Sequence, residues 1–533
     1  MTCGYIDTHN QACERLYYPA HTALLRSLGS MERIMSKTDV RKIRAGLKHP
    51  IIDADGHWAE FHPHMRKEFK RIGGGLAVEA FDMATARIPK SLNMSVAERQ
   101  HRRMGQEAFW FLPTKNTLDR ATAMMPRLLY ERLDEIGLDF CVIYPTSALG
   151  WYRLPSEKHR RALVRAYNTF TADQFRPYSD RIIPAAIIPM YSPEEAVEEL
   201  EHVSKQLGLR VCMTGSLIRR PIPALEQEHP EAAKFVEWYD TIGIDSIHDY
   251  DPVWAKFREL KIAPSFHQSA RSILLRNSPS NFCYNHIGHF ASASEATAKA
   301  LFFGGVTRRF PELNFGFLEG GVGWACSLYA DLIGHWEKRN PEGLENTNPA
   351  RLDRAGILAL AEKYAKPEVL EAVRQGEGLD DNGDGTGGVE HLDDYWRCEI
   401  TRKEDFTDLY VNRYYFGCEA DDPINAWAFN RKALPMGARL NAFFSSDIGH
   451  FDVPDMTKVV PEAYELVEHG LLDDDDFRDF TFTNAVRFWG EVNPDFFKGT
   501  AVEREAAEVL GKSKPPSSQR RPAGAGTHPA AAT

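Results

Sequence analysis

The chain contains 533 residues, of which 43% are hydrophobic and 26% are charged, a composition that excludes a disordered or fibrous protein and predicts a sizeable buried core. Its 64 basic and 75 acidic residues give a formal net charge of −11. This charge argues against nucleic acids and membranes as partners and favours a small-molecule substrate. Because the sequence has neither a signal-peptide pattern nor an apolar run of about 18 residues, we expect a cytoplasmic protein.

Composition divides the chain into three parts. Residues 1–49 form an N-terminal extension with a basic, helix-prone piece, and residues 50–495 are predicted to form one domain. Residues 512–533 are rich in Pro, Ala, Gly and Ser, which predicts a disordered tail.

Short apolar runs alternate with longer segments of helical period through the central part of the chain. This alternation is typical of parallel strands joined by crossover helices. Eight strand candidates predict an α/β fold of the (β/α)8 TIM-barrel type, which closes a parallel sheet without free edges. The predicted strands are residues 50–54, 139–146, 181–190, 209–215, 263–268, 314–320, 414–420 and 441–447. The predicted helices include residues 121–137, 156–175, 193–207, 251–261, 291–310 and 322–338.

Two long insertions interrupt the even spacing of these elements. One covers roughly residues 56–120, after the first strand, and the other covers residues 339–412, between the sixth and seventh strands. Loops that follow the strands of a TIM barrel surround its active site, so the first insertion is a candidate substrate cover. The second insertion is large enough to serve as an interface in a homo-oligomer.

Side chains that can bind a metal ion follow several predicted strands. They are Asp55 and His57 after the first strand, His267 after the fifth, Glu319 after the sixth, Glu419 after the seventh, and Asp447 after the eighth, with His450 close behind. One polar residue at a strand end is ordinary, but the C-terminal ends of barrel strands converge on one mouth. Two imidazoles and two carboxylates there would suit a divalent ion such as Zn²⁺ or Mn²⁺. Asp55 and His57 also share one face of an extended strand, because side chains alternate.

Four segments resemble the signature regions of a known family. The segments IIDADGHWAE, APSFHQSA, GGVTRRFPELNFGFLEGGVGW and FFSSDIGHFD are similar to those of the amidohydrolase-related family (amidohydrolase 2). The similarity points to the branch that includes aminocarboxymuconate-semialdehyde decarboxylase, and it covers roughly residues 50–490. It implies a metal-dependent TIM barrel that carries out hydrolysis or non-oxidative decarboxylation of small acids.

The resemblance also assigns roles to individual residues. It implies that Asp55, His57, His267 and Asp447 bind one divalent metal ion, either Zn²⁺ or Mn²⁺. The decarboxylases of this family carry a histidine after the sixth strand, whereas this chain has Glu319 there. Their mechanism therefore cannot be transferred to this chain unchanged.

These patterns lead to one preferred function and two alternatives. We expect a metal-dependent hydrolase that cleaves a C–C or C–N bond in a small carboxylated or aromatic molecule. The alternatives are a non-oxidative decarboxylase, or a catalytically silent barrel that serves as a binding protein. We expect Asp447 to shuttle a proton and Glu319 to assist it. His289 or His286 is expected near the site on one shared helix face, although a hydrogen-bond network at the start of that helix is an equal alternative.

Overall fold

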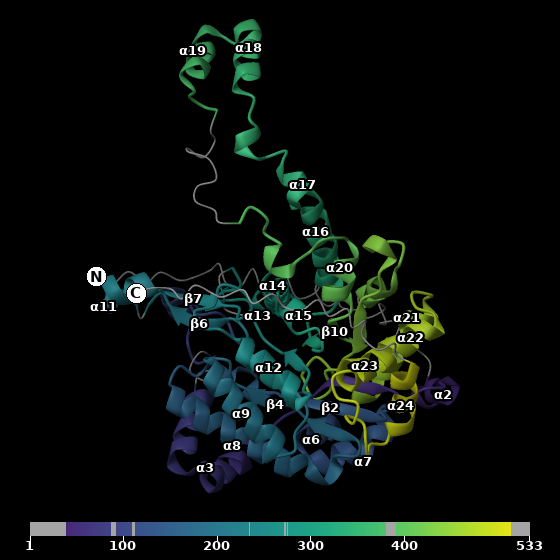
Figure 1. Ribbon diagram of the computed structural model, residues 1–533. Coiled ribbons are helices and arrows are strands. Elements are labelled where there is room, and N and C mark those ends of the chain that lie inside the picture. Colours follow the sequence, from purple (N-terminus) through teal and green to yellow (C-terminus); the bar gives the residue numbers. More distant parts are fainter. Residues whose placement is uncertain are drawn as a thin grey trace, which may run out of the picture.

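The computed structural model describes residues 39–86, 92–108, 112–233, 235–270, 273, 275–379 and 391–512. Most of the predicted extension 1–49 and all but Lys512 of the predicted tail 512–533 lie outside the described residues. The described chain forms a body of helices around a central sheet, from which a helical arm projects (Figure 1). Within this part of the chain, no helix is both long and apolar enough to cross a membrane.

A ring of parallel strands forms the centre of the body, and every predicted strand contributes to it. Neighbouring strands are paired in parallel, and β3 and β4 act as one strand of the ring because only Ala185 separates them. In order around the ring, the described strands are β1 (Ile52–Trp58), β2 (Phe140–Pro145), β3 (Ile182–Pro184) with β4 (Ala186–Ile188), β5 (Cys212–Thr214), β8 (Pro264–Phe266), β9 (Phe315–Phe317), β10 (Tyr414–Cys418) and β11 (Asn441–Phe444).

The ring closes between its last strand, β11, and its first strand, β1. The backbone N–H of Asp447, just beyond β11, donates to the carbonyl of Asp55 at 3.0 Å, and that of His57 donates to the carbonyl of Ile448 at 2.7 Å. The buried carboxylate of Asp53 accepts from the backbone N–H of Ser446 at 2.9 Å and from its hydroxyl at 2.5 Å. The predicted (β/α)8 barrel is therefore confirmed, and its seam lies beside Asp55 and His57.

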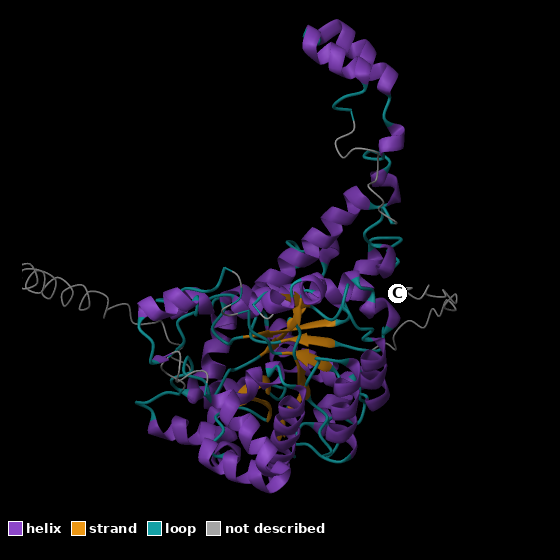
Figure 2. Cartoon of the chain, turned by 90° about the vertical axis from the view of Figure 1, so that its left-hand side faces the viewer, coloured by secondary structure: helices purple, strands orange, loops and turns teal. Residues whose placement is uncertain are grey.

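Helices cover the outside of the ring, as Figure 2 shows. Because the strands of the ring are covered on both faces, their sequences are almost continuously apolar. The helices that follow the strands of the ring include α7 (Pro126–Ile136), α8 (Glu157–Phe175), α9 (Pro193–Lys205), α12 (Asp251–Leu260), α14 (His289–Phe303), α16 (Gly323–Arg339), α21 (Val459–Glu468) and α23 (Asn484–Gly490). The remaining α-helices of the barrel body are α2 (Val40–Gly46), α6 (Thr117–Met124), α13 (Phe282–His286), α15 (Val306–Arg309), α22 (Asp474–Arg478) and α24 (Glu503–Lys512).

Two predicted helices are interrupted. The segment 121–137 is divided between α6 and α7, because Pro126 begins a new helix. The segment 291–310 is divided between α14 and α15, because Gly305 adopts a left-handed conformation with φ of 70°.

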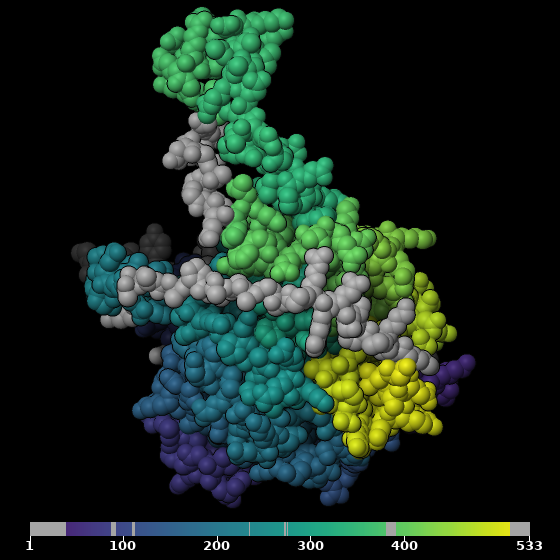
Figure 3. All heavy atoms as spheres, viewed as in Figure 1, coloured from purple at the N-terminus to yellow at the C-terminus, as the bar shows by residue number. Residues whose placement is uncertain are grey.

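Both insertions lie where the sequence predicts them. The segment between β1 and β2 contains α3 (His62–Thr85) and α5 (Val96–Arg102) before α6 and α7. The segment between β9 and β10 contains α17 (Pro341–Leu344), α18 (Arg354–Tyr364), α19 (Pro367–Gln375) and α20 (Glu404–Phe406). Of these, α18 and α19 pack against each other and stand clear of the barrel in Figures 1 and 3. A smaller excursion after β5 carries an antiparallel hairpin of β6 (Ile218–Pro221) and β7 (Glu237–Asp240), with α10 (Pro223–Glu228) and α11 (Pro230–Ala233) between them.

Candidate metal centre

The four predicted metal ligands come together at one end of the barrel. Asp55 and His57 lie within β1, His267 directly follows β8, and Asp447 lies three residues beyond β11. All four side chains are buried. Since the strands are parallel, their C-terminal ends lie at the same end of the barrel, and residues far apart in sequence meet there.

Interatomic distances show how closely these side chains approach one another. The Nε2 atoms of His57 and His267 lie 3.1 Å apart. The Oδ1 atom of Asp55 lies 3.5 Å from the His57 Nε2 atom and 3.6 Å from that of His267. The Oδ1 atom of Asp447 also lies 3.5 Å from His57 Nε2.

The two imidazoles are neutral in this environment. Burial lowers the pKa of His57 well below its usual value, with further lowering from His450 and His267, and burial lowers the pKa of His267 to about 3. His57 Nδ1 lies 2.9 Å from the carbonyl of Pro145, which can only accept a hydrogen bond. The ring proton of His57 is therefore on Nδ1, and Nε2 points its lone pair toward His267 and the two aspartates.

The carboxylates carry an electrostatic cost in the absence of a cation. Burial raises the pKa of Asp55 well above its usual value, and Asp53 and Glu419 raise it further. Burial does the same to Asp447, with additional effects from Glu319 and Asp452. Asp55 Oδ1 accepts no hydrogen bond. Buried acceptors that face one another without donors are what a bound divalent cation would neutralise, so the donor set fits a metal ion.

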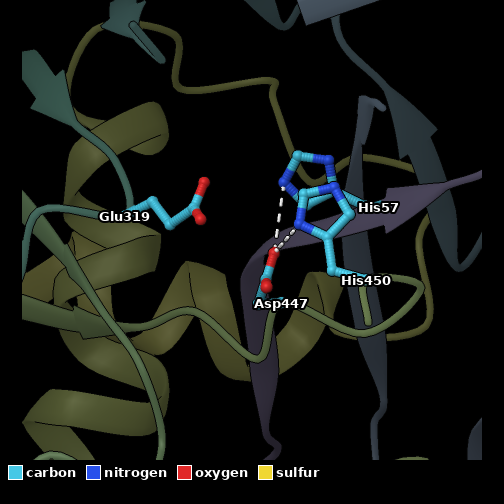
Figure 4. A group of neighbouring side chains, drawn as sticks. All are labelled: His57, Glu319, Asp447 and His450. Carbon is cyan, nitrogen blue, oxygen red and sulfur yellow. Dashed lines mark ion pairs between the residues drawn. The ribbon is translucent and has the colours of Figure 1, made fainter. Parts of the chain in front are cut away.

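Glu319 and His450 adjoin this set (Figure 4). Glu319 Oε2 lies 3.2 Å from His267 Nε2, and Glu319 points toward Asp447 across the site. His450 Nδ1 lies 2.6 Å from Asp447 Oδ1, and its ring stacks on His57 with centroids 3.8 Å apart. The sequence places His450 three residues after Asp447, but this spacing alone gave it no role.

The backbone is unusual at two of these positions. Glu319 and Asp447 have φ angles of 55° and 53°, in the left-handed region that non-glycine residues rarely adopt. Such conformations cost free energy and cluster at functional sites. Both residues turn the chain sharply after the end of a strand, and this turn directs their carboxylates toward the histidines.

His286 and His289 line a cavity of about 340 Å³ beside the centre, together with Glu319. The prediction that the two histidines share one helix face is wrong. His286 ends α13 and His289 begins α14, because Gly288 between them adopts a φ of 69° and interrupts the helix. The rings nevertheless lie side by side, with centroids 4.6 Å apart.

Comparisons with known proteins agree with the resemblance found in the sequence. Residues 147–352 match the model of the family described as Amidohydrolase. No curated protein matches the chain.

Several solved structures are similar over much of the chain. A 2,6-dihydroxybenzoate decarboxylase from Rhizobium is 13% identical, covering 83% of this chain and 98% of its own, with a TM-score of 0.44. A 5-carboxyvanillate decarboxylase from Sphingomonas paucimobilis has the same identity, coverage and TM-score. An amidohydrolase from Mycobacterium avium subsp. paratuberculosis K-10 is 16% identical, covering 84% of this chain and 100% of its own, with a TM-score of 0.47. The match shows that residues 147–352 are similar to the amidohydrolase family, as the sequence motifs predict, and it supports the interpretation of the chain as an enzyme, a metal-dependent hydrolase or carboxy-lyase.

Proposed function

We propose that this chain is a hydrolase that holds one divalent ion, Zn²⁺ or Mn²⁺, with Asp55, His57, His267 and Asp447. The observation that carries the proposal is the approach of His57 Nε2 to one acceptor atom of each of the other three residues, at 3.1–3.5 Å. Ligands bound at about 2.0–2.2 Å around a tetrahedral ion would lie roughly 3.4 Å apart. The proposed catalytic unit is residues 50–495, which include the insertion 339–412.

A divalent ion bound there would supply Lewis acidity to a substrate oxygen and to water. The residues of this chain would supply the rest of the chemistry. His57 is held in one tautomer by the carbonyl of Pro145, so its Nε2 atom stays available as a ligand. Glu319 and Asp447 face each other across the site, where one carboxylate can take a proton from water and pass it to the leaving group. The substrate would be a small molecule that enters through the adjoining cavity.

A second candidate reaction is non-oxidative decarboxylation. The observation that favours it is Glu419, beside the cavity, whose pKa is raised to about 7 by burial and by Asp452, Asp421 and Asp422. A carboxyl group that is partly protonated near neutral pH can donate a proton to the carbon from which CO₂ departs. Release of CO₂ from a substrate would identify this reaction, and hydrolysis would release none.

The proposal is tested by the metal content of purified protein. Elemental analysis of the wild type should find about one Zn or Mn per chain, as expected for a single four-ligand site. His267→Ala and Asp447→Ala should each lose most of this metal, because each removes a ligand from the site. His335→Ala changes an exposed histidine on α16 and is the matched control, which should keep its metal. A folded wild type that binds no added Zn²⁺ or Mn²⁺ would contradict the proposal.

A further inference from the structure

The projecting arm, residues 353–376 with helices α18 and α19, has almost no core of its own. In this segment only Ala361 is buried, and none of its side chains belongs to the hydrophobic core of the barrel. Its two helices have 11 and 9 residues. Helices this short are marginal in water unless packing supports them. The barrel of the same chain does not supply this support, because the arm stands clear of it in Figures 1 and 3.

The sequence of α18 is apolar in every direction around its axis. Residues 355–361 read AGILALA, a run of small or apolar residues that extends over about two helical turns. A helix without a polar face is normally surrounded by other elements. Packing against α19 covers only one side of α18. The other side therefore lacks a covering element within the described part of the chain.

Three large side chains mark the uncovered surface. Leu360 and Tyr364 are 60% and 71% exposed, and their spacing of four residues places them on one face of α18. Val369 of α19 is 49% exposed. Single exposed apolar residues are ordinary, but several on a small segment that lacks a core indicate an interaction surface.

The charge of the arm favours a second copy of this chain as the partner. Residues 353–376 contain four acidic and four basic residues, so the arm has no net charge, whereas the whole chain has a formal net charge of −11. Two copies therefore repel each other as whole molecules, but their arms do not. Arg374 Nη2 also lies 3.5 Å from Glu362 Oε1, so two of these charges already face each other within the arm. A strongly charged partner would find no complementary surface on the arm.

The shape of the arm suits pairing with an identical arm. A two-fold axis brings the same surface of both copies together, so an apolar patch is covered by its own equivalent. Two helical hairpins that pair in this way form a four-helix bundle, an architecture that buries helix faces too small to be stable alone. Because the arm projects from the body, the two negatively charged barrels can remain apart (Figure 1).

We propose that the arm is a dimerisation element, and that the arms of two copies of this chain pack together as a four-helix bundle that covers Leu360, Tyr364 and Val369. The proposal goes beyond the proposed function, since it involves no residue of the candidate metal centre.

The mass of the protein in solution tests the proposal. In analytical ultracentrifugation at tens of micromolar, the full chain should sediment as a dimer, with twice the chain mass of 60.4 kDa. The arm-less protein, in which a short Gly-Ser linker replaces residues 353–376, should be a monomer at the same concentration. A full chain that is monomeric under these conditions would overturn the proposal, and so would a dimer that persists without the arm.

Two point variants test the surface without removing the arm. Leu360→Asp and Tyr364→Asp should each raise the Kd of the dimer at least about tenfold, because each would bury a charge in an apolar interface. Both positions are exposed in the single chain, so neither change should unfold the barrel. Leu471→Asp is the matched control, since Leu471 is also exposed but lies just beyond α21 on the barrel, and its Kd should stay that of the wild type. An equal loss in all three variants would contradict the proposal.

Co-expression identifies what the arm contacts in the second copy. A tagged full chain should co-purify with an untagged full chain but not with the untagged arm-less protein, because arm-to-arm pairing needs an arm on both copies. Capture of the arm-less protein would show that the arm binds the barrel of another copy, and it would overturn the four-helix bundle.

Discussion

At the scale of single residues, His57 shows how the chain prepares a ligand atom. The Pro145 carbonyl fixes its ring proton, His450 stacks on one face, and the Nε2 atom is left facing the aspartates. Groups that orient metal ligands in this way contribute to affinity although they need not touch the metal. His450 also approaches Asp447 at 2.6 Å, so it contacts two of the proposed ligands at once.

His450→Gln should therefore weaken metal binding without unfolding the protein. We expect the Kd for Zn²⁺, measured by competition with a fluorescent chelator, to rise roughly 10- to 100-fold, as for other residues that support metal ligands. The circular dichroism spectrum should stay that of the wild type. An unchanged Kd in this variant would show that His450 does not position the ligands.

At the scale of elements, the loop that leaves β11 runs against β1 and depends on Gly449. Gly449 has a φ of 93°, and a Cβ atom there would lie 2.2 Å from the carbonyl oxygen of His57. The loop thus approaches the ligand strand more closely than any side chain would allow. Close approach of two backbones is one of the roles that only glycine can fill.

Gly449→Ala should destabilise the protein by about 3 kcal/mol and lower its metal content, because it combines an unfavourable φ with a steric overlap at His57. Gly499→Ala is the matched control. Gly499 has a φ of 77°, but no atom lies within 4 Å of the position that a Cβ would take, so only the conformational cost of about 1 kcal/mol applies. Urea denaturation measures both values. Equal losses in the two variants would mean that the contact with His57 is unimportant.

The strands of the barrel were predictable because each is a short apolar run followed by polar residues, and His267 illustrates this pattern at the end of β8. The convergence of the polar residues at the strand ends followed from the parallel topology, whereas the choice of Asp55, His57, His267 and Asp447 among them came from the resemblance to the family. The helix break at Gly288 was not predictable, because a glycine inside a helical pattern often remains helical. The contact between His450 and His57 was also hidden, since it depends on the path of the loop through Gly449.

At the scale of the whole molecule, the arm formed by α18 and α19 differs from the rest of the chain. The side chains of Leu360 and Tyr364 are 60% and 71% exposed, although both are large and apolar. The two helices pack against each other and stand away from the barrel in Figures 1 and 3. The arm therefore adds little to the core that holds the metal centre together.

Replacing residues 353–376 by a short Gly-Ser linker should leave both the melting temperature and the metal content unchanged. Differential scanning calorimetry and elemental analysis measure the two quantities. Leu332→Ala is the positive control, because Leu332 lies in the buried core at the base of the same insertion and its truncation should cost about 2–5 kcal/mol. A marked fall in melting temperature after the arm is removed would show that the barrel depends on it.

The seam at Asp53 also has a consequence for synthesis of the chain. Asp53 and its partner Ser446 are 393 residues apart, so one edge of β1 has no neighbour until nearly the entire barrel has been translated. At about 5–20 residues per second, this delay amounts to roughly 20–80 s on the ribosome. During that interval the nascent chain exposes an unpaired strand edge, which is a template for aggregation. Production of this enzyme should therefore respond to chaperone supply and to the rate of translation more strongly than its final stability would suggest.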